Sequence, residues 1–238
     1  MAAADAGDKR YLVLGCKPWN RRVFDDVIRA YPGRWEYLDV PAELTVEKLQ
    51  ALRPRYLFFL HWSWKVPPAI TEAFECVCFH MTDVPYGRGG SPLQNLIARG
   101  HRQTKLTALR MKGEMDAGPV YGKEDLSLEG NAEEIFIRAT QLSARMLARI
   151  AAEEPAPIPQ TGTPVTFARR KPEESELPAG VGAIAHLGAL HDFIRMLDAD
   201  GYPRAFFDHG GFRYTFSRAA LGDGRIVADV SITAVVKR

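Results

Sequence analysis

Two short runs of apolar residues limit what this chain can fold into. Tyr11–Gly15 and Tyr56–His61 are each about one strand long and carry almost no polar side chains. A strand that is apolar on both faces must be covered on both, as in a parallel sheet flanked by helices. Segments with helical spacing follow them, at Arg22–Tyr31 and Pro67–Phe74. This alternation predicts an α/β fold, a mostly parallel sheet with helices on both faces.

The same alternation continues to Glu153. Thr45 and Asn131 are suited to begin helices, because their side-chain oxygens can accept a backbone N–H of the first turn. We therefore expect a Rossmann-like domain over residues 1–153. Its further predicted strands are Trp35–Val40, Cys76–Met81, Leu106–Met111 and Val120–Leu126, and its further predicted helices follow Thr45 to Leu52, run from Pro92 to Arg99 and run from Asn131 to Glu153.

The composition changes after Glu153. Residues 154–180 hold six prolines and no sustained period, which predicts a Pro-rich linker over the surface. Residues 181–238 are predicted to form a small C-terminal α+β unit with a β-hairpin turning at Gly210-Gly211. So small a unit should pack on the first domain or on a partner subunit, which leaves a homodimer open. Its predicted elements are a helix at His186–Leu197 and strands at Arg204–Asp208, Phe212–Arg218 and Arg225–Val236.

Composition excludes several classes of protein. The formal net charge of the 238 residues is only +2, which argues against binding to nucleic acid or to an anionic membrane. No segment approaches the ~18 apolar residues of a membrane span, and the first residues lack the apolar centre of a signal peptide. Three cysteines make no disulfide framework, and the spacing of Cys76 and Cys78 is poor for zinc. We expect a reduced, cytoplasmic protein without a bound metal.

The segment from Cys76 to Tyr121 carries the candidate chemistry. His80 ends a predicted strand and precedes a loop rich in glycine and proline, where backbone can approach a ligand closely. Asp116 lies in a later turn between Gly113 and Gly118. A buried carboxylate needs a partner, so we predict that Asp116 pairs with His80 at the mouth of a cleft. The alternative is structural, with a backbone-bonded histidine and an ordinary turn aspartate.

At these residues the sequence resembles the 10-formyltetrahydrofolate-dependent formyltransferase family, which includes glycinamide ribonucleotide, methionyl-tRNA and nucleotide-sugar formyltransferases. The family pattern is Asn-x-His, a loop with proline and Arg-Gly, and a distal Asp-x-Gly element. The similarity spans roughly residues 50–150, and Arg195–Phe206 is similar to the small C-terminal part of sugar formyltransferases. The matching residues are His80, Pro85, Arg88-Gly89, Pro92 and Asp116-Ala117-Gly118.

The resemblance implies transfer of a formyl group from 10-formyltetrahydrofolate, the co-substrate, to the primary amine of a nucleotide-linked 4-amino deoxysugar, as in the pseudaminic-type branch. His80 would stabilise the oxyanion or relay a proton, and Asp116 would orient the imidazole. The resemblance places the cofactor at Trp62, Ser63, Trp64, Val66, Arg88, Gly89, Gly113, Glu114 and Met115. The amine substrate is expected at Lys17, Trp19, Asn20, Thr82 and Tyr86.

Cys78 departs from the family pattern, which has an asparagine that donates a hydrogen bond to the formyl oxygen. A thiol is a weak donor. His80 with a backbone amide could replace the asparagine, Thr82 or Asn95 could supply the bond, or the protein could be slow or inactive. We expect retained activity and count Cys78 with His80 and Asp116 as catalytic candidates. A nucleophilic Cys78 is disfavoured, because formyl transfer needs no covalent intermediate.

Two other interpretations remain open. The acceptor could be another amine, on an antibiotic precursor or an aminoacyl-tRNA, or the chain could be a folate- or nucleotide-binding relative that has lost catalysis. The basic run Arg169-Arg170-Lys171 could contact tRNA. The low net charge argues against that, as does a C-terminal unit too small for the larger barrel of methionyl-tRNA formyltransferases. A nucleic-acid partner is therefore not expected.

Overall fold

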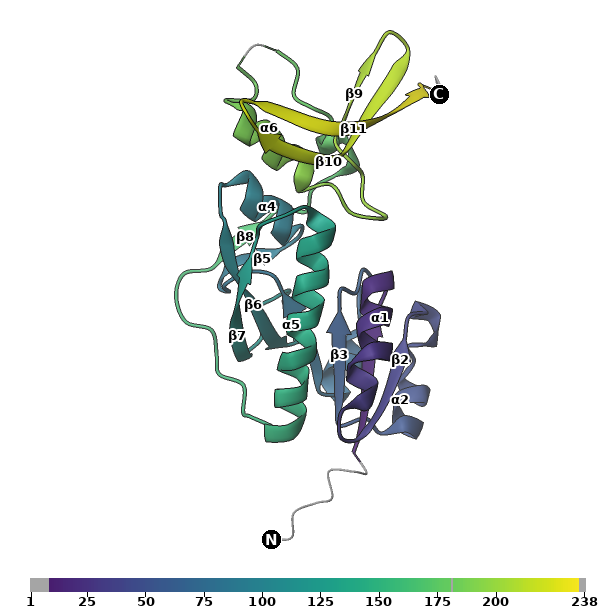
Figure 1. The fold of residues 1–238 in the computed structure, drawn as a ribbon. Helices are drawn as coiled ribbons and strands as arrows, with labels where there is room; N and C mark the ends of the chain where they lie inside the picture. Colours follow the sequence, from purple (N-terminus) through teal and green to yellow (C-terminus); the bar gives the residue numbers. More distant parts are fainter. Residues whose placement is uncertain (1–8, 181, 236–238) are drawn as a thin grey trace. The chain divides into compact units, whose positions relative to one another are not determined.

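The computed structural model describes residues 9–180 and 182–235 and divides the chain into two compact units. Unit 1 comprises Met1–Gly89, Thr104–Leu126 and Ile137–Thr166, and unit 2 comprises Gly90–Gln103, Ser127–Phe136 and Phe167–Arg238 (Figure 1). The chain thus enters unit 2 and returns before its C-terminal part begins. The domain boundaries expected at residues 153 and 180 stay a prediction. The expectation that the first residues form no signal peptide concerns residues outside the described ranges.

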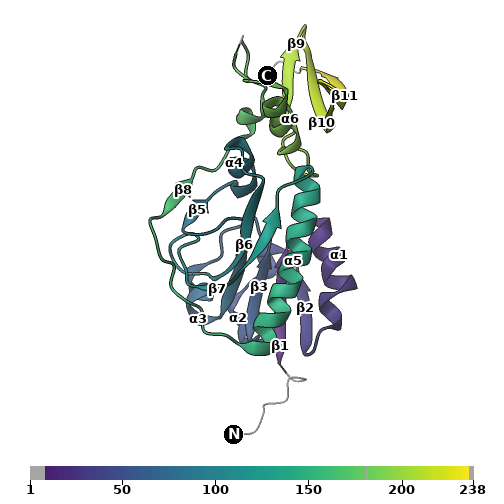
Figure 2. The ribbon, with the colours of Figure 1, turned by 60° about the vertical axis from the view of Figure 1, so that its left-hand side comes forward.

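Unit 1 is built on a six-stranded sheet with the strand order β2-β1-β3-β4-β6-β7 (Figures 1 and 2). Four neighbouring strands run parallel, and β6 runs antiparallel to β4. The predicted α/β fold with a mostly parallel sheet is confirmed. The strands are β1 (Arg10–Gly15), β2 (Arg34–Leu38), β3 (Tyr56–Leu60), β4 (Cys76–His80), β6 (Gln103–Arg110) and β7 (Val120–Ser127).

The helices of unit 1 begin close to the predicted signals. The Thr45 hydroxyl accepts the Lys48 backbone N–H at 3.2 Å, as expected of an N-cap. The first helix begins earlier than predicted, since Pro18 occupies a first-turn position where proline is tolerated, and it ends at Asp26. The elements are α1 (Pro18–Asp26), η2 (Ile28–Ala30), η3 (Pro41–Glu43), α2 (Val46–Leu52), α3 (Pro68–Ala73) and most of α5 (Ala132–Glu153).

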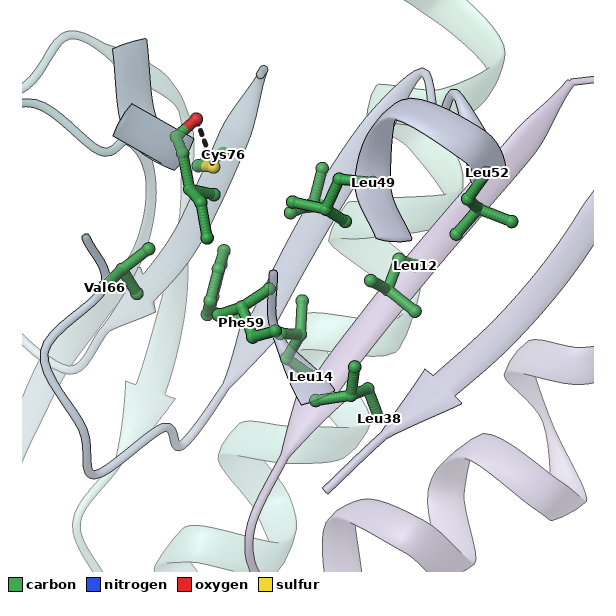
Figure 3. Close-up of a cluster of buried hydrophobic side chains, with 11 residues drawn as sticks. Leu12, Leu14, Leu38, Leu49, Leu52, Phe59, Val66 and Cys76 are labelled. Atoms are coloured by element: carbon green, nitrogen blue, oxygen red, sulfur yellow. Dashed lines mark hydrogen bonds between the residues drawn. The ribbon is translucent and has the colours of Figure 1, made fainter. Parts of the chain in front are cut away.

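Successive side chains of the central strands point to opposite faces of the sheet, and both sets are apolar, which explains why helices cover both faces. One set of strand side chains packs against α2 and α3 in a buried cluster (Figure 3) that includes Leu12, Phe59, Leu49 and Ile70. Each such side chain, once fully buried, contributes roughly 1.5–3 kcal/mol. The alternate residues face α1 and α5, as the bond from Tyr11 Oη to the Ala151 carbonyl at 3.4 Å shows.

A two-stranded ribbon was not predicted. It pairs β5 (Tyr86–Gly89) with β8 (Val165–Phe167), and the two lie side by side in Figure 2. The Pro-rich stretch leading to β8 is also held, because Val120 and Ile158 exchange two backbone hydrogen bonds of 2.8 Å. The stretch therefore lies against unit 1 by backbone pairing, although the Ile158 side chain is 70% exposed.

Unit 2 contains an antiparallel sheet in the order β11-β10-β9. Gly210 and Gly211 both have positive φ, of 60° and 82°, which suits a tight hairpin turn. The predicted small α+β unit with a hairpin is confirmed, while Val236, the predicted end of the last strand, lies outside the described residues. The elements of unit 2 are α4 (Pro92–Ala98), η4 (Pro172–Ser175), α6 (Leu187–Arg195), β9 (Phe206–His209), β10 (Phe212–Gly222) and β11 (Arg225–Ala234).

Polar side chains hold unit 2 together. Arg195 is 3% exposed and donates to the carbonyls of Leu128 and Gly130 at 2.6 and 2.8 Å. Asn131 and Glu134 form the reciprocal bonds of a capping box at the start of α5.

None of the described helices is both long and apolar enough to cross a bilayer.

Candidate active site

His80 closes β4 and is held from both sides of its ring. Its Nε2 lies 2.8 Å from the Gly87 carbonyl oxygen, which also accepts the Thr82 hydroxyl at 3.1 Å. A carbonyl oxygen can only accept, so Nε2 carries a hydrogen. The other ring nitrogen, Nδ1, is then left to face Asp116 Oδ2 at 3.5 Å. His80 is therefore bonded to the backbone and also faces Asp116, the two roles that the sequence analysis treated as alternatives.

Asp116 reaches His80 on the loop between β6 and β7. This loop starts at the far end of β4, because β6 is antiparallel and the Met111 N–H bonds the Cys76 carbonyl at 2.8 Å. The Arg110 N–H bonds the Pro119 carbonyl at 2.9 Å and closes the base of the loop. Asp116 adopts a φ of 54°, and its Oδ2 also accepts the Gly89 N–H at 2.9 Å. The structure thus brings together the two side chains expected to converge.

The facing atoms of the His80–Asp116 pair are placed so that they could share a proton. Both side chains are nearly buried, at 9% and 13% exposure. With the hydrogen of Nε2 committed to Gly87, an unprotonated Nδ1 would direct its lone pair at a carboxylate, which is repulsive. A proton on Nδ1 or on Oδ2 removes that repulsion. At 3.5 Å the contact is longer than a good hydrogen bond, and such catalytic contacts often tighten when substrate binds.

Cys78 lies between Cys76 and His80 on the same side of β4, because side chains two residues apart share a face. Its half-buried thiol packs against the buried cluster beside α2 and α3. Burial raises the pKa of the Cys78 thiol far above its ordinary value, and the charge of Asp116 adds to this. The thiol is therefore protonated near neutral pH, which agrees with the expectation that Cys78 is not a nucleophile.

The two other donors considered for the missing asparagine are already engaged. The Thr82 hydroxyl, in unit 1, donates to Gly87 and is fully buried. The Asn95 amide, in unit 2, donates to the carbonyls of Gly90, Ser91 and Ala168 at 3.0–3.1 Å. Both ring nitrogens of His80 are engaged as well, with the Gly87 carbonyl and with Asp116, so backbone amides are the donors that remain.

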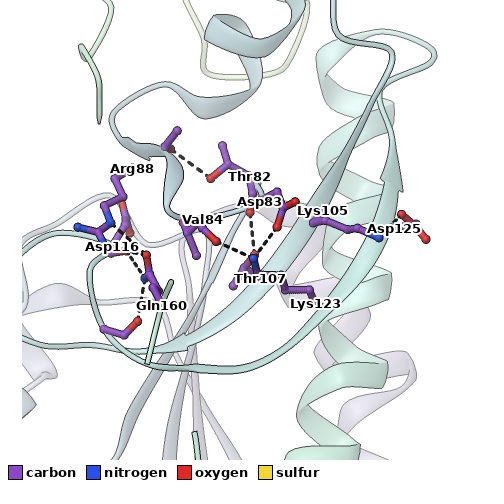
Figure 4. A network of polar contacts seen from close by, with 12 residues as sticks. Thr82, Asp83, Val84, Arg88, Lys105, Thr107, Asp116, Lys123, Asp125 and Gln160 are labelled. Atoms are coloured by element: carbon purple, nitrogen blue, oxygen red, sulfur yellow. Dashed lines mark hydrogen bonds and ion pairs between the residues drawn. The ribbon is translucent and has the colours of Figure 1, made fainter. Parts of the chain in front are cut away.

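Arg88 and Gly89, expected to bind cofactor, take part in building the site (Figure 4). Arg88 Nε and Nη2 lie 3.1 and 2.8 Å from Gln160 Oε1, and Nη1 lies 3.6 Å from Glu114 Oε1. Gln160 Nε2 in turn donates to the carbonyls of Asp116 and Gly118 at 2.7 and 2.8 Å. No local pattern indicated Gln160, because it lies in the Pro-rich stretch more than forty residues from its partners.

The remaining cofactor candidates fall in two exposed loops. In the loop after β3, the rings of Trp62 and Trp64 meet edge to face with centroids 4.9 Å apart, and Trp64 is 46% exposed. The Trp62 indole N–H is buried and has no partner among the described residues. Ser63 is exposed, whereas Val66 packs into the core cluster. Gly113, Glu114 and Met115 are exposed on the loop that carries Asp116.

Three of the five residues expected to bind the amine substrate point inward. Asn20 is fully buried, with its amide bonded to Thr140 Oγ1 at 3.0 Å and to the Lys17 N–H at 3.1 Å. Thr82 is engaged with Gly87, and Trp19 is 6% exposed. The polar atoms of Asn20 and Thr82 are thus bonded within the protein, and a binding role for the three residues stays a prediction. Lys17 and Tyr86 are half-buried.

A surface pocket of about 330 Å³ lies in unit 1 and is lined by Thr71, Glu72, Arg110, Lys112 and Gly113, which do not include His80 or Asp116. Within residues 9–180 and 182–235, no group of three or more His, Cys, Asp or Glu side chains is arranged to hold a metal ion.

Known proteins match this sequence in two ways. The family model described as methionyl-tRNA formyltransferase, C-terminal domain, matches residues 172–233. Methionyl-tRNA formyltransferases from Rickettsia massiliae and Rickettsia felis are 29% and 30% identical over 171 residues, which is 69% of this chain and 55% of each relative. The chain thus spans about half the length of the curated relatives it matches.

Solved structures match over more of the chain. A methionyl-tRNA formyltransferase from Clostridium thermocellum is 42% identical, with a TM-score of 0.88 over 95% of this chain and 100% of that one. A sugar N-formyltransferase from Shewanella sp FDAARGOS_354 has a TM-score of 0.66 over 96% and 99% of the two chains, at 13% identity, a level that shows the fold alone. The His80–Asp116 pair and the 42% sequence identity over the whole length of the Clostridium chain lead to one conclusion: this chain belongs to the formyltransferase family.

Proposed function

We propose that this protein is an N-formyltransferase that uses 10-formyltetrahydrofolate as the formyl donor. The observation that carries the proposal is the nearly buried His80–Asp116 pair, in which Nδ1 lies 3.5 Å from Oδ2. HypX from Aquifex aeolicus, which shares the fold at 18% identity, has been solved in complex with tetrahydrofolic acid. That likeness agrees with a folate donor for this chain, and the donor remains part of the proposal.

The reaction balances without a covalent intermediate on the protein. A neutral amine attacks the formyl carbon, a C–N bond forms, and the bond from that carbon to N10 of the folate breaks. The amine loses one proton and N10 gains one. The His80–Asp116 pair can donate its proton toward the oxyanion or leaving nitrogen and accept the amine proton, a role typically worth ~10²–10⁴ in rate.

For the acceptor we place an aminoacyl-tRNA first. The sequence favoured a nucleotide-linked amino sugar, which is not confirmed, because the structure that is 42% identical carries the name methionyl-tRNA formyltransferase and the sugar enzyme is 13% identical. The size of the C-terminal unit no longer argues against tRNA, since this chain covers all of the Clostridium chain. Nucleic acid therefore returns as a candidate partner.

A sugar nucleotide remains the second candidate because of one observation. Unit 2 contains as many acidic as basic residues, whereas a nucleic-acid site usually shows a basic patch. The two acceptors predict different responses to salt. Contacts to tRNA phosphates release counterions, so KM for tRNA should rise steeply with salt, while KM for a sugar nucleotide should change little.

The test supplies 10-formyltetrahydrofolate with aminoacylated initiator tRNA, or with nucleotide-linked 4-amino sugars, and follows tetrahydrofolate release. We expect release with aminoacylated tRNA, and release slowed by about 10²–10⁴ but still measurable in His80→Ala and Asp116→Asn. Asp125→Asn is the matched control, an exposed carboxylate paired with Lys105 on the surface of unit 1. Release with sugars alone would establish the second candidate. Absence of release with every acceptor, together with a folate-dependent rise in melting temperature, would show a binding protein without catalysis.

A further inference from the structure

Gln160 connects the loop that carries Asp116 to the strand that follows the His80 loop. Its side chain reaches from the Pro-rich stretch to two carbonyls of that loop and to the guanidinium of Arg88 on β5 (Figure 4). The backbone two residues earlier is fixed, because Ile158 and Val120 exchange two hydrogen bonds of 2.8 Å. Gln160 is therefore presented from an anchored segment.

The partners allow only one orientation of the amide. Arg88 has only donors, so it must face Oε1, and the carbonyls of Asp116 and Gly118 only accept, so they must face Nε2. Glutamine has the donors and the acceptor that these four contacts require. Glutamate would keep the bond to Arg88 and lose the donors to the loop, and a methionine of similar length would keep neither.

One of these contacts falls on Asp116 itself. Asp116 adopts a φ of 54°, a left-handed conformation that residues other than glycine adopt infrequently. Its carbonyl accepts from Gln160 while its carboxylate accepts the Gly89 N–H and faces His80. The backbone and the side chain of Asp116 are thus held by separate partners, and Gln160 holds the backbone.

We propose that Gln160 is a positioning residue, which fixes the Asp116 turn so that Oδ2 faces His80 Nδ1. Arg88 orients the Gln160 amide for this purpose. The inference rests on the proposed function for its kinetic consequence, but the geometry of the histidine can be measured without turnover. A small displacement of a reacting group can cost about 10²-fold in rate. Gln160→Met should therefore lower kcat/KM by roughly 10- to 100-fold while the KM for folate changes less than about threefold.

A double-mutant comparison separates positioning from general stability. In an Asp116→Asn background the positioned carboxylate is absent, so adding Gln160→Met should lower kcat/KM little further. Gln160→Glu should behave like Gln160→Met, because it too lacks the donors to the loop. Gln141→Ala is the matched control, an exposed glutamine on α5 whose loss should leave kcat/KM unchanged.

The second measurement is the ¹⁵N spectrum of the His80 imidazole in the folate-free protein. In the wild type the Nδ1 resonance should be shifted by the facing carboxylate of Asp116, and in Gln160→Met it should move toward that of an imidazole nitrogen without this neighbour. The proposal is overturned if this resonance is unchanged in Gln160→Met, or if the effects of the two substitutions on kcat/KM simply add. A wild-type protein without turnover would refute the proposed function, and the spectrum would still decide the role of Gln160.

Discussion

Replacing Cys78 with asparagine tests how the site stabilises the formyl oxygen. Cys78 lies on β4 two residues before His80, where the family pattern has an amide donor. Losing one oxyanion donor typically costs ~2.7–4 kcal/mol, or about 10²–10³ in turnover. Thr82 and Asn95 cannot replace it without giving up bonds to backbone carbonyls. Cys78→Asn should therefore raise kcat, by up to about 10²-fold.

The same change should lower stability, because Cys78 packs against the buried cluster that includes Phe59. An amide buried there without a partner costs about 1–3 kcal/mol. For a chain of this length each kcal/mol lowers the melting temperature by roughly 2–4 °C. Turnover and melting temperature should therefore change in opposite directions, which no general loosening of the fold would produce.

The assay is single-turnover release of tetrahydrofolate, with melting temperature measured on the same samples. Cys78→Ala removes even the weak thiol donor and should lower kcat modestly. Cys16→Ser, in the loop after β1, is the control and should change kcat little. Loss of turnover in Cys78→Asn, with folate binding and fold intact, would refute this account of how the formyl oxygen is held.

Two further substitutions test the surroundings of the site. Gly118→Ala should abolish turnover and lower the melting temperature, because its Cβ would lie 1.7 Å from the Arg110 carbonyl oxygen; Gly222→Ala, whose Cβ meets nothing within 4 Å, should do neither. Burial lowers the pKa of His61 to about 4, below its ordinary value of 6.5. The unfolded chain therefore takes up this proton first, and about 3 kcal/mol of stability should be lost as the pH falls from 6.5 to 4. His61→Asn, which tolerates the positive φ there, should lose less in urea unfolding at pH 4.5 relative to pH 7; equal losses would refute this assignment.

Features with a strong local pattern were predictable. The apolar runs at β1 and β3 indicated a sheet covered on both faces, and Thr45 marked the start of α2. The ribbon of β5 and β8 was missed, because strands of four and three residues show no period and pair across a long stretch of chain. Short elements of this kind are defined by their partner rather than by their own composition.

The candidate site was likewise predictable from the sequence only in part. The pairing of His80 with Asp116 followed from the need of a buried carboxylate for a partner and from the family pattern. The inward orientation of Asn20 and Thr82 did not, because a polar residue in a loop is equally compatible with binding a ligand and with satisfying backbone groups. Gln160 was beyond local reasoning, since its four contacts are all remote in sequence.

The direction of β6 has a consequence for the durability of this enzyme. Because β6 runs antiparallel to β4, the loop after it starts at the end of β4 that is far from His80. The carboxylate therefore returns on a nine-residue loop, 111–119, which is held by backbone hydrogen bonds at its base and by the Gln160 side chain near Asp116. Such a loop can open without melting the sheet beneath it. Catalytic competence would then fail by local fraying, at milder conditions than those that unfold the molecule.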